Sequence, residues 1–163
     1  MKNKKTTILV FVGICLISIT ILIIINSNPQ VEGWNDFKKS SIKNYSFVKD
    51  VNLDRITPPD FRIIYSLNRK IDSEEVNKVF LNTKNYILSE KVFEDMKKYH
   101  SKKYKYSFVN IYIVMTYWDN GEIFRYKIFS ASDVDGEPSY DSFTTWYIEY
   151  NNEPTEIYNP KED

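Results

Sequence analysis

The side chains that most often perform catalysis or bind metals are scarce in this chain of 163 residues, which contains one histidine and one cysteine. A catalytic zinc site needs several His or Cys ligands, so the sequence excludes one. Only four glycines are present, and neither a Gly-x-Ser-x-Gly nucleophile elbow nor a Gly-x-x-x-x-Gly-Lys phosphate loop occurs. The commonest hydrolase and nucleotide-binding designs are therefore excluded.

The histidine, His100, lies in a lysine-rich segment, and no carboxylate stands beside it in the sequence. An activated general base needs a partner that positions it. We therefore expect a solvated histidine at the end of a helix. A Ser–His arrangement completed by a distant acid stays open as the functional alternative.

The acidic segment Asp133–Asp141 is the best candidate for a metal site, because hard cations such as calcium bind several oxygens in a tight loop. The twelve-residue calcium loop requires Gly at its sixth position and Glu at its twelfth. Pro138 and Thr144 occupy those positions. We therefore expect an acidic turn between two strands, with no metal and no cofactor.

Charge is distributed unevenly, although basic and acidic side chains number 22 each. Lysines cluster with tyrosines over residues 97–105, whereas residues 133–163 hold nine acids and one lysine, a net charge of −8. Outside the cell, anionic lipids or wall polymers fit the basic cluster better than nucleic acid does. A plain solvated surface at the end of a helix is the favoured interpretation of this cluster, because runs of charge usually mark exposed surface. The candidate interaction residues are Lys97, Lys98, Lys102, Lys103, Lys105, Glu149, Glu153 and Glu156.

Residues 8–25 contain no charged side chain, and twenty residues over 6–25 span about 30 Å as a helix, the thickness of a bilayer core. Three lysines precede this run, and the next basic residue is Lys38. The positive-inside rule then places the amino terminus in the cytoplasm and residues 30–163 outside. The sequence thus predicts a single-pass signal anchor over residues 1–29.

The alternatives to an anchor are two kinds of processed segment. A cleaved signal peptide has a shorter apolar core and ends in a small-x-small site, which is missing after Ile25. A lipoprotein signal needs a small residue before the modified cysteine, and Ile14 precedes Cys15. We therefore expect Cys15 to be an ordinary apolar residue of the membrane helix.

Periodicity outlines the elements of the outer domain. Residues 61–67 alternate like a half-buried strand, and Asp72 with Glu75 forms a capping box before a helical pattern. That pattern indicates either one helix over about 73–100 or two helices with a break near 82–86. Strands over 107–118 and 122–130 flank the turn signal Asn120-Gly121, which predicts a hairpin. A further strand is expected over 143–150, and a short one over 45–51.

The resulting order β-α-β-β-β predicts an α+β fold, with an antiparallel sheet and one long helix, or two consecutive ones, on one face. Residues 30–60 are expected to form a juxtamembrane linker containing Trp34 and Phe37, which lie either at the lipid headgroups or back on the domain. The globular domain is expected over 61–150 and an acidic tail over 151–163.

These observations favour a bacterial, membrane-tethered interaction domain without catalytic activity, of a sensor, accessory or immunity type. Its partner would be a protein or an anionic surface polymer, with the membrane contacted through the anchor. The alternative is a small cell-surface hydrolase of wall polymer, in which two carboxylates lie about 5–10 Å apart. Its candidate acids are Asp133, Asp135, Glu137 and Asp141.

We predict that residues 1–29 remain attached in the mature protein, because the apolar run is long and the cleavage motif is absent. Intact mass and amino-terminal sequencing of protein from membranes test this. A mature chain that starts near Asn26, or a lipid on Cys15, would contradict it.

Overall fold

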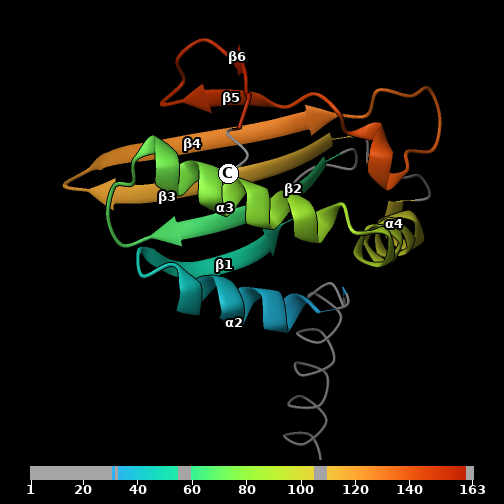
Figure 1. The fold of residues 1–163 in the computed structure, drawn as a ribbon, viewed down its shortest axis with the longest axis horizontal. Helices are drawn as coiled ribbons and strands as arrows, with labels where there is room; N and C mark the ends of the chain where they lie inside the picture. The colour runs from blue at the N-terminus through green and yellow to red at the C-terminus, as the bar shows by residue number, and fades with distance from the viewer. Residues whose placement is uncertain (1–30, 32, 55–59, 105–109, 161–163) are drawn as a thin grey trace, which may run out of the picture.

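The computed structural model describes residues 31, 33–54, 60–104 and 110–160. Within them, six strands form one sheet in the order β1-β2-β3-β4-β5-β6, with helices packed against it (Figure 1). The elements are α2 (Trp34–Asn44), β1 (Val48–Asp54), β2 (Asp60–Leu67), α3 (Ser73–Ile87), α4 (Glu90–Tyr104), β3 (Asn110–Asp119), β4 (Glu122–Ala131), the 3₁₀ helix η1 (Tyr140–Ser142), β5 (Tyr147–Tyr150) and β6 (Glu156–Ile157).

The sheet is mixed, which corrects the expectation of an antiparallel sheet while confirming the α+β class. Strands β2 and β3 pair in parallel, with Phe61 opposite Ile111 and Tyr65 opposite Met115, and every other neighbouring pair is antiparallel. Parallel neighbours need a long crossover, because the chain must return to the end where the first strand began. Helices α3 and α4 provide that crossover.

The helical pattern resolves into two helices. Helix α3 begins with the predicted capping box, in which the Glu75 N–H donates to Asp72 Oδ1 at 2.9 Å and the Asp72 N–H to Glu75 Oε2 at 3.3 Å. The break falls at 88–89, where the Ser89 hydroxyl donates to the Tyr86 carbonyl at 2.7 Å. It lies a few residues after the predicted position.

The predicted hairpin is confirmed. Asp119 pairs with Glu122, and the two residues between them, Asn120 and Gly121, have φ angles of 47° and 93°. Both angles lie in the left-handed region that a two-residue hairpin turn requires, which Asn and Gly adopt most readily. The turn sequence therefore fixes the register of β3 against β4.

Residues 34–44 form helix α2, where the sequence indicated a linker. Phe37 is buried and stacks on Tyr86 of α3, with ring centroids 4.1 Å apart and planes at 9°. This aromatic thus packs on the domain. The expected short strand is β1, which begins at Val48. The predicted anchor lies outside the described residues, and no helix within them combines the length and apolarity needed to cross a bilayer.

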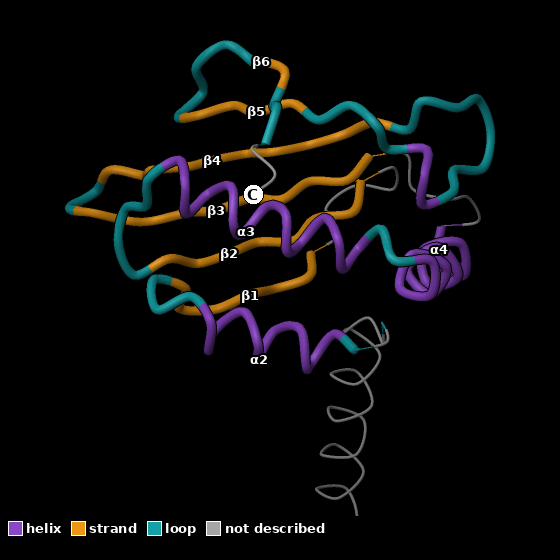
Figure 2. Tube along the Cα trace, in the orientation of Figure 1, coloured by secondary structure: helices purple, strands orange, loops and turns teal. Residues whose placement is uncertain are grey.

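The core lies between the sheet and its three helices: α3 crosses one face of the sheet, α2 lies along β1, and α4 follows at the end of α3 (Figure 2). Phe61, Ile63 and Tyr65 of β2 point toward the helices and are fully buried. The Tyr65 hydroxyl hydrogen-bonds to Thr83 Oγ1 at 2.7 Å, linking the central strand to α3. Burial raises the pKa of Tyr65 to about 12.

We predict that the free energy of unfolding falls as the pH rises from about 10 to about 12, because the folded state holds the Tyr65 proton more tightly than the unfolded chain does. This group contributes about 2–3 kcal/mol to that loss. Tyr65→Phe should cost about 1–2 kcal/mol at neutral pH, through the lost hydrogen bond, and should lack the alkaline component. Urea unfolding of both proteins at about pH 8 and about pH 11 tests this; an equal stability difference at both values would contradict it.

Candidate binding surface

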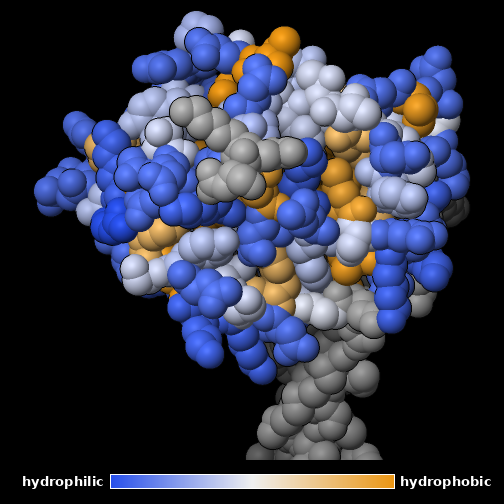
Figure 3. Space-filling model, in the orientation of Figure 1, coloured by the Kyte–Doolittle hydropathy of each residue, from blue (hydrophilic) through white to orange (hydrophobic). Residues whose placement is uncertain are grey.

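No described helix covers the sheet face opposite α3. Side chains alternate along a strand, so Arg62, Ile64 and Ser66 of β2 point away from the helical layer. On the helical side, by contrast, the surface is mostly hydrophilic, with apolar atoms visible in gaps between the elements (Figure 3). The uncovered face is therefore the first candidate for a binding surface.

A row of side chains crosses this face from β2 to β6. The register places Arg62 beside Tyr112, Tyr112 beside Phe129, Phe129 beside Tyr147, and Tyr147 beside Ile157. These five residues are called the aromatic row. Four are partly buried and Ile157 is 63% exposed. The row therefore presents apolar and aromatic surface to solvent at one level of the sheet.

The rings of the aromatic row stand face to face. Tyr112 and Phe129 have centroids 5.7 Å apart and planes at 25°, and Phe129 and Tyr147 have centroids 5.5 Å apart and planes at 28°. The Arg62 guanidinium carbon lies 5.4 Å from the centre of the Tyr112 ring. Such stacks restrain one another. The flat faces of these rings are largely occupied by neighbours, so a ligand would meet mainly ring edges.

Charged groups flank the row. Lys127 Nζ lies 5.2 Å from the centre of the Phe129 ring and also forms an ion pair with Glu149. Burial raises the pKa of Tyr112, and the nearby Asp60 carboxylate adds to the effect while Arg62 opposes it. The Tyr112 hydroxyl therefore stays protonated at neutral pH and remains a hydrogen-bond donor.

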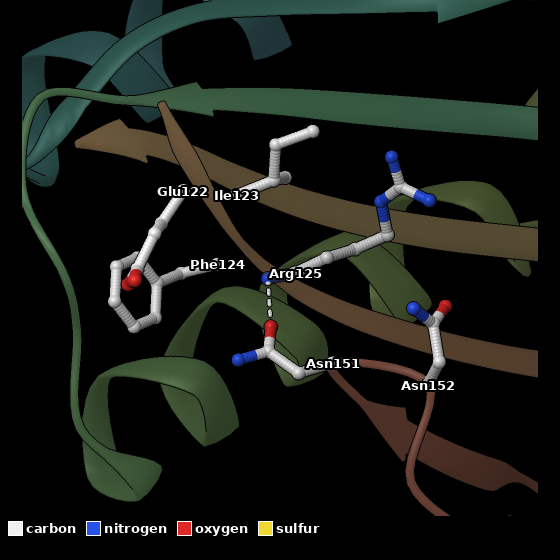
Figure 4. A pocket seen from close by; sticks show the side chains of 6 residues that line it. All are labelled: Glu122, Ile123, Phe124, Arg125, Asn151 and Asn152. Atoms are coloured by element: carbon white, nitrogen blue, oxygen red, sulfur yellow. Dashed lines mark hydrogen bonds between the residues drawn. The ribbon is translucent and has the colours of Figure 1, made fainter. Parts of the chain in front are cut away.

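A hollow of about 330 Å³ opens at the turn end of β4 (Figure 4). The Arg125 N–H donates to Asn151 Oδ1 at 2.8 Å along one side of it. Ile123 and Arg125 project to one side of β4, whereas Glu122 and Phe124 project to the other. The lining residues are Glu122, Ile123, Phe124, Arg125, Asn151 and Asn152.

The predicted basic cluster touches the acidic segment. Lys97 forms ion pairs with Glu94 at 3.6 Å and Glu137 at 3.4 Å, so α4 is joined to the β4–β5 loop. Lys98 is exposed. The side chains of Lys102 and Lys103 lie outside the described part of the structure, as does the whole of residue 105.

The three predicted acidic contacts do not form one group. Glu149 is partly buried in its ion pair with Lys127 on the uncovered face. Glu153 and Glu156 are exposed, and they lie in the β5–β6 turn region and on β6. Glu149 therefore has a structural partner, whereas the other two remain available as surface charges.

The acidic segment 133–141 uses its carboxylates to close its own loop. Asp133 Oδ2 accepts the Thr144 N–H at 3.1 Å and also the Thr144 hydroxyl. The Ser139 hydroxyl donates to Asp141. Among the described residues, no group of three or more His, Cys, Asp or Glu side chains is arranged to hold a metal.

His100 is buried, which corrects the expectation of a solvated side chain. It follows Phe93 and Met96 at helical spacing, and all three lie on the buried side of α4. The flanking lysines suggested exposure, but the apolar periodicity of the helix decides the orientation. The prediction of a solvated histidine at a helix end is therefore wrong.

The sequence analysis missed the aromatic row. Its members come from β2, β3, β4, β5 and β6, and only the cross-strand register brings them together. A signal was present in the two hairpin strands, where Tyr112, Val114, Lys127 and Phe129 fall on the face opposite the core residues. A strand with one face in water usually alternates apolar inward residues with polar outward ones. Aromatic residues at the outward positions depart from that pattern.

No protein-family model, no curated protein and no solved structure matches this chain.

We predict that Glu149→Lys destabilises the domain by about 1–2 kcal/mol, because it removes a partly buried ion pair and places two cations opposite each other across β4 and β5. Glu153→Lys, on the exposed turn, is the matched control and should change the free energy of unfolding by less than about 0.5 kcal/mol. Urea unfolding at low and high salt measures both. Equal effects of the two reversals would show that the Glu149 pair contributes nothing.

Proposed function

We propose that this chain is a membrane-tethered, extracytoplasmic binding protein without catalytic activity, and that it docks a protein partner on the uncovered sheet face. The tether is the apolar segment within residues 1–29. The observation that carries the proposal is the aromatic row, Arg62-Tyr112-Phe129-Tyr147-Ile157, on a face that no described helix covers.

The composition of this face supports a protein partner. Tyr, Phe, Trp and Arg are enriched in the buried centres of protein interfaces and account for most of their binding energy. Besides the row, Trp118 is 67% exposed and Ile123 is 38% exposed on the same face. Exposed apolar side chains that lie together typically mark an interaction site.

The size of the face is adequate. At about 4.8 Å between strands and about 3.3 Å per residue, the six strands present a flat area of roughly 650 Å². Each partner in a standard protein interface contributes about 600–1,000 Å². The uncovered face therefore accounts for most of one side of such an interface.

Ring orientation favours a protein over a stacked polymer. Nucleic-acid bases bind aromatic side chains by stacking on their flat faces, and sugar rings would need the same faces. In the aromatic row those faces are taken by neighbours, since Phe129 lies between Tyr112 and Tyr147. Side chains of a protein partner can instead pack between the exposed ring edges.

The charged residues are assigned a secondary function. Lys98, Glu153 and Glu156 are exposed on the molecule, and charges outside the centre of an interface raise the association rate more than the affinity. Together with the other lysines over 97–105, they are proposed to steer a charged partner. A surface polymer or a lipid bilayer would bind the same lysines.

Photo-crosslinking in cells tests the proposed face. Benzoylphenylalanine in place of Ile157, at the end of the aromatic row, should give a protein adduct, whereas the same group in place of Tyr140 should not. Tyr140 is the matched control, because it is 42% exposed but lies on the β4–β5 loop. Trp118→Asp should weaken the Ile157 adduct. Adducts from position 140 alone, or none from position 157, would contradict the proposal.

A further inference from the structure

Strand β4 is longer than the strand beside it, and this leaves part of its edge without a neighbour. The ladder between β4 and β5 covers only Tyr126–Phe129, and Arg125 is held by Asn151 just beyond it. The hollow lined by Ile123 and Arg125 lies where β5 would continue if it were longer (Figure 4). The hollow is therefore an open strand edge.

The register decides which backbone groups face this edge. In an antiparallel hairpin, hydrogen-bonded and non-bonded residues alternate along each strand. The closing pair Asp119 and Glu122 directs the Glu122 backbone groups toward β3, so those of Ile123 point the other way. Arg125 follows the same alternation. Its N–H donates to Asn151 Oδ1 at 2.8 Å, and its carbonyl accepts the Asn151 N–H at 2.9 Å. The Ile123 N–H and carbonyl thus face the hollow.

A turn keeps the edge open. Asn151 and Asn152 have φ angles of 47° and 66°, and the Glu153 N–H returns to the Tyr150 carbonyl at 2.8 Å. This tight turn sends the chain back as β6 before it can pair with Ile123. Asn151 Oδ1 accepts the Arg125 N–H, which a backbone carbonyl would accept if β5 continued along β4.

The side chains of β4 that lie beside the edge on the uncovered sheet face are apolar and basic, whereas Glu122 projects to the other side of the strand. Ile123 lies opposite Trp118, and both are exposed on the uncovered sheet face. Arg125 is exposed on the same face, and no ion pair to it is found among the described residues. A guanidinium without an acidic partner, next to a free donor and acceptor, complements an extended chain that carries a carboxylate.

We propose that the open edge of β4 at Ile123 receives an extended, acidic segment of a protein partner, which adds a short strand to the sheet. The Ile123 N–H and carbonyl pair with the backbone of the segment, Arg125 binds its carboxylate, and Trp118 packs on an apolar side chain. This rests on the proposed binding function and adds the kind of segment that the partner supplies.

A labelled peptide tests the edge directly. Fluorescein-Asp-Val-Thr-Val-Thr-Val-Asp-amide carries an acid at each end, so either strand direction brings a carboxylate to Arg125. Fluorescence anisotropy with the full chain should show saturable binding. A peptide with Asn at both ends should bind about tenfold more weakly, as expected for the loss of a charge-assisted hydrogen bond. Arg125→Gln should abolish the difference between the two peptides.

Variants at Ile123 separate backbone pairing from simple apolar contact. Ile123→Pro removes the N–H that faces the hollow, at an edge position where proline is tolerated, and should weaken the acidic peptide at least about fivefold. Ile123→Thr keeps the N–H and is the matched control. If the proline variant does not fold, a backbone N-methylated peptide on the unaltered protein makes the same test.

The outcomes distinguish this proposal from the one on which it rests. No saturable binding, equal binding of the Asp and Asn peptides, or equal binding by Ile123→Pro and Ile123→Thr would overturn the edge proposal. If the Ile157 crosslink persists in that case, the sheet face still docks a protein and the edge alone is wrong. If the crosslink is absent as well, both proposals fail together.

Discussion

The parallel pairing of β2 with β3 is the constraint on which the rest of the structure depends. It places the strand with Phe61, Ile63 and Tyr65 beside the strand with Ile111 and Met115, at the centre of the sheet. Because parallel neighbours require a crossover, α3 and α4 must connect them, with α3 crossing one face of the sheet and α2 lying along β1. The opposite face receives no helix from this connection. The one-sided core and the exposed aromatic row therefore have the same origin.

An uncovered sheet face in water must limit its apolar exposure, and this one does so by pairing side chains across strands. Arg62 lies over Tyr112, and Lys127 lies near Phe129 while its charge is balanced by Glu149. These contacts hold the rings in fixed positions before any partner arrives. A surface that is already ordered loses less conformational entropy on binding. The contacts that limit the apolar exposure of the face in solution thus also order its side chains for docking.

Local signals were readable from the sequence, and long-range ones were not. The capping box at Asp72 and the turn at Asn120-Gly121 were predicted because each depends on a few adjacent residues. The direction of β3 against β2 depends on pairings across about 50 positions, and the aromatic row depends on the register of five strands at once, which no local pattern specifies. The burial of His100 follows from the apolar periodicity that it shares with Phe93 and Met96, whereas the lysines beside it in the sequence indicated the opposite.

The same distinction applies to the four acids predicted for a hydrolase, Asp133, Asp135, Glu137 and Asp141. A hydrolase would need two carboxylates free to act on a substrate, and the acids nominated for that were chosen by proximity in sequence. In the folded chain, Asp133 holds Thr144, Asp141 accepts the Ser139 hydroxyl, and Glu137 reaches Lys97. These three carboxylates have a structural partner within or beside the loop, whereas Asp135 is exposed. A carboxylate whose oxygens fasten a loop is poorly placed to move a proton, so the contacts of the folded loop account for three of the four acids that proximity in sequence had grouped together.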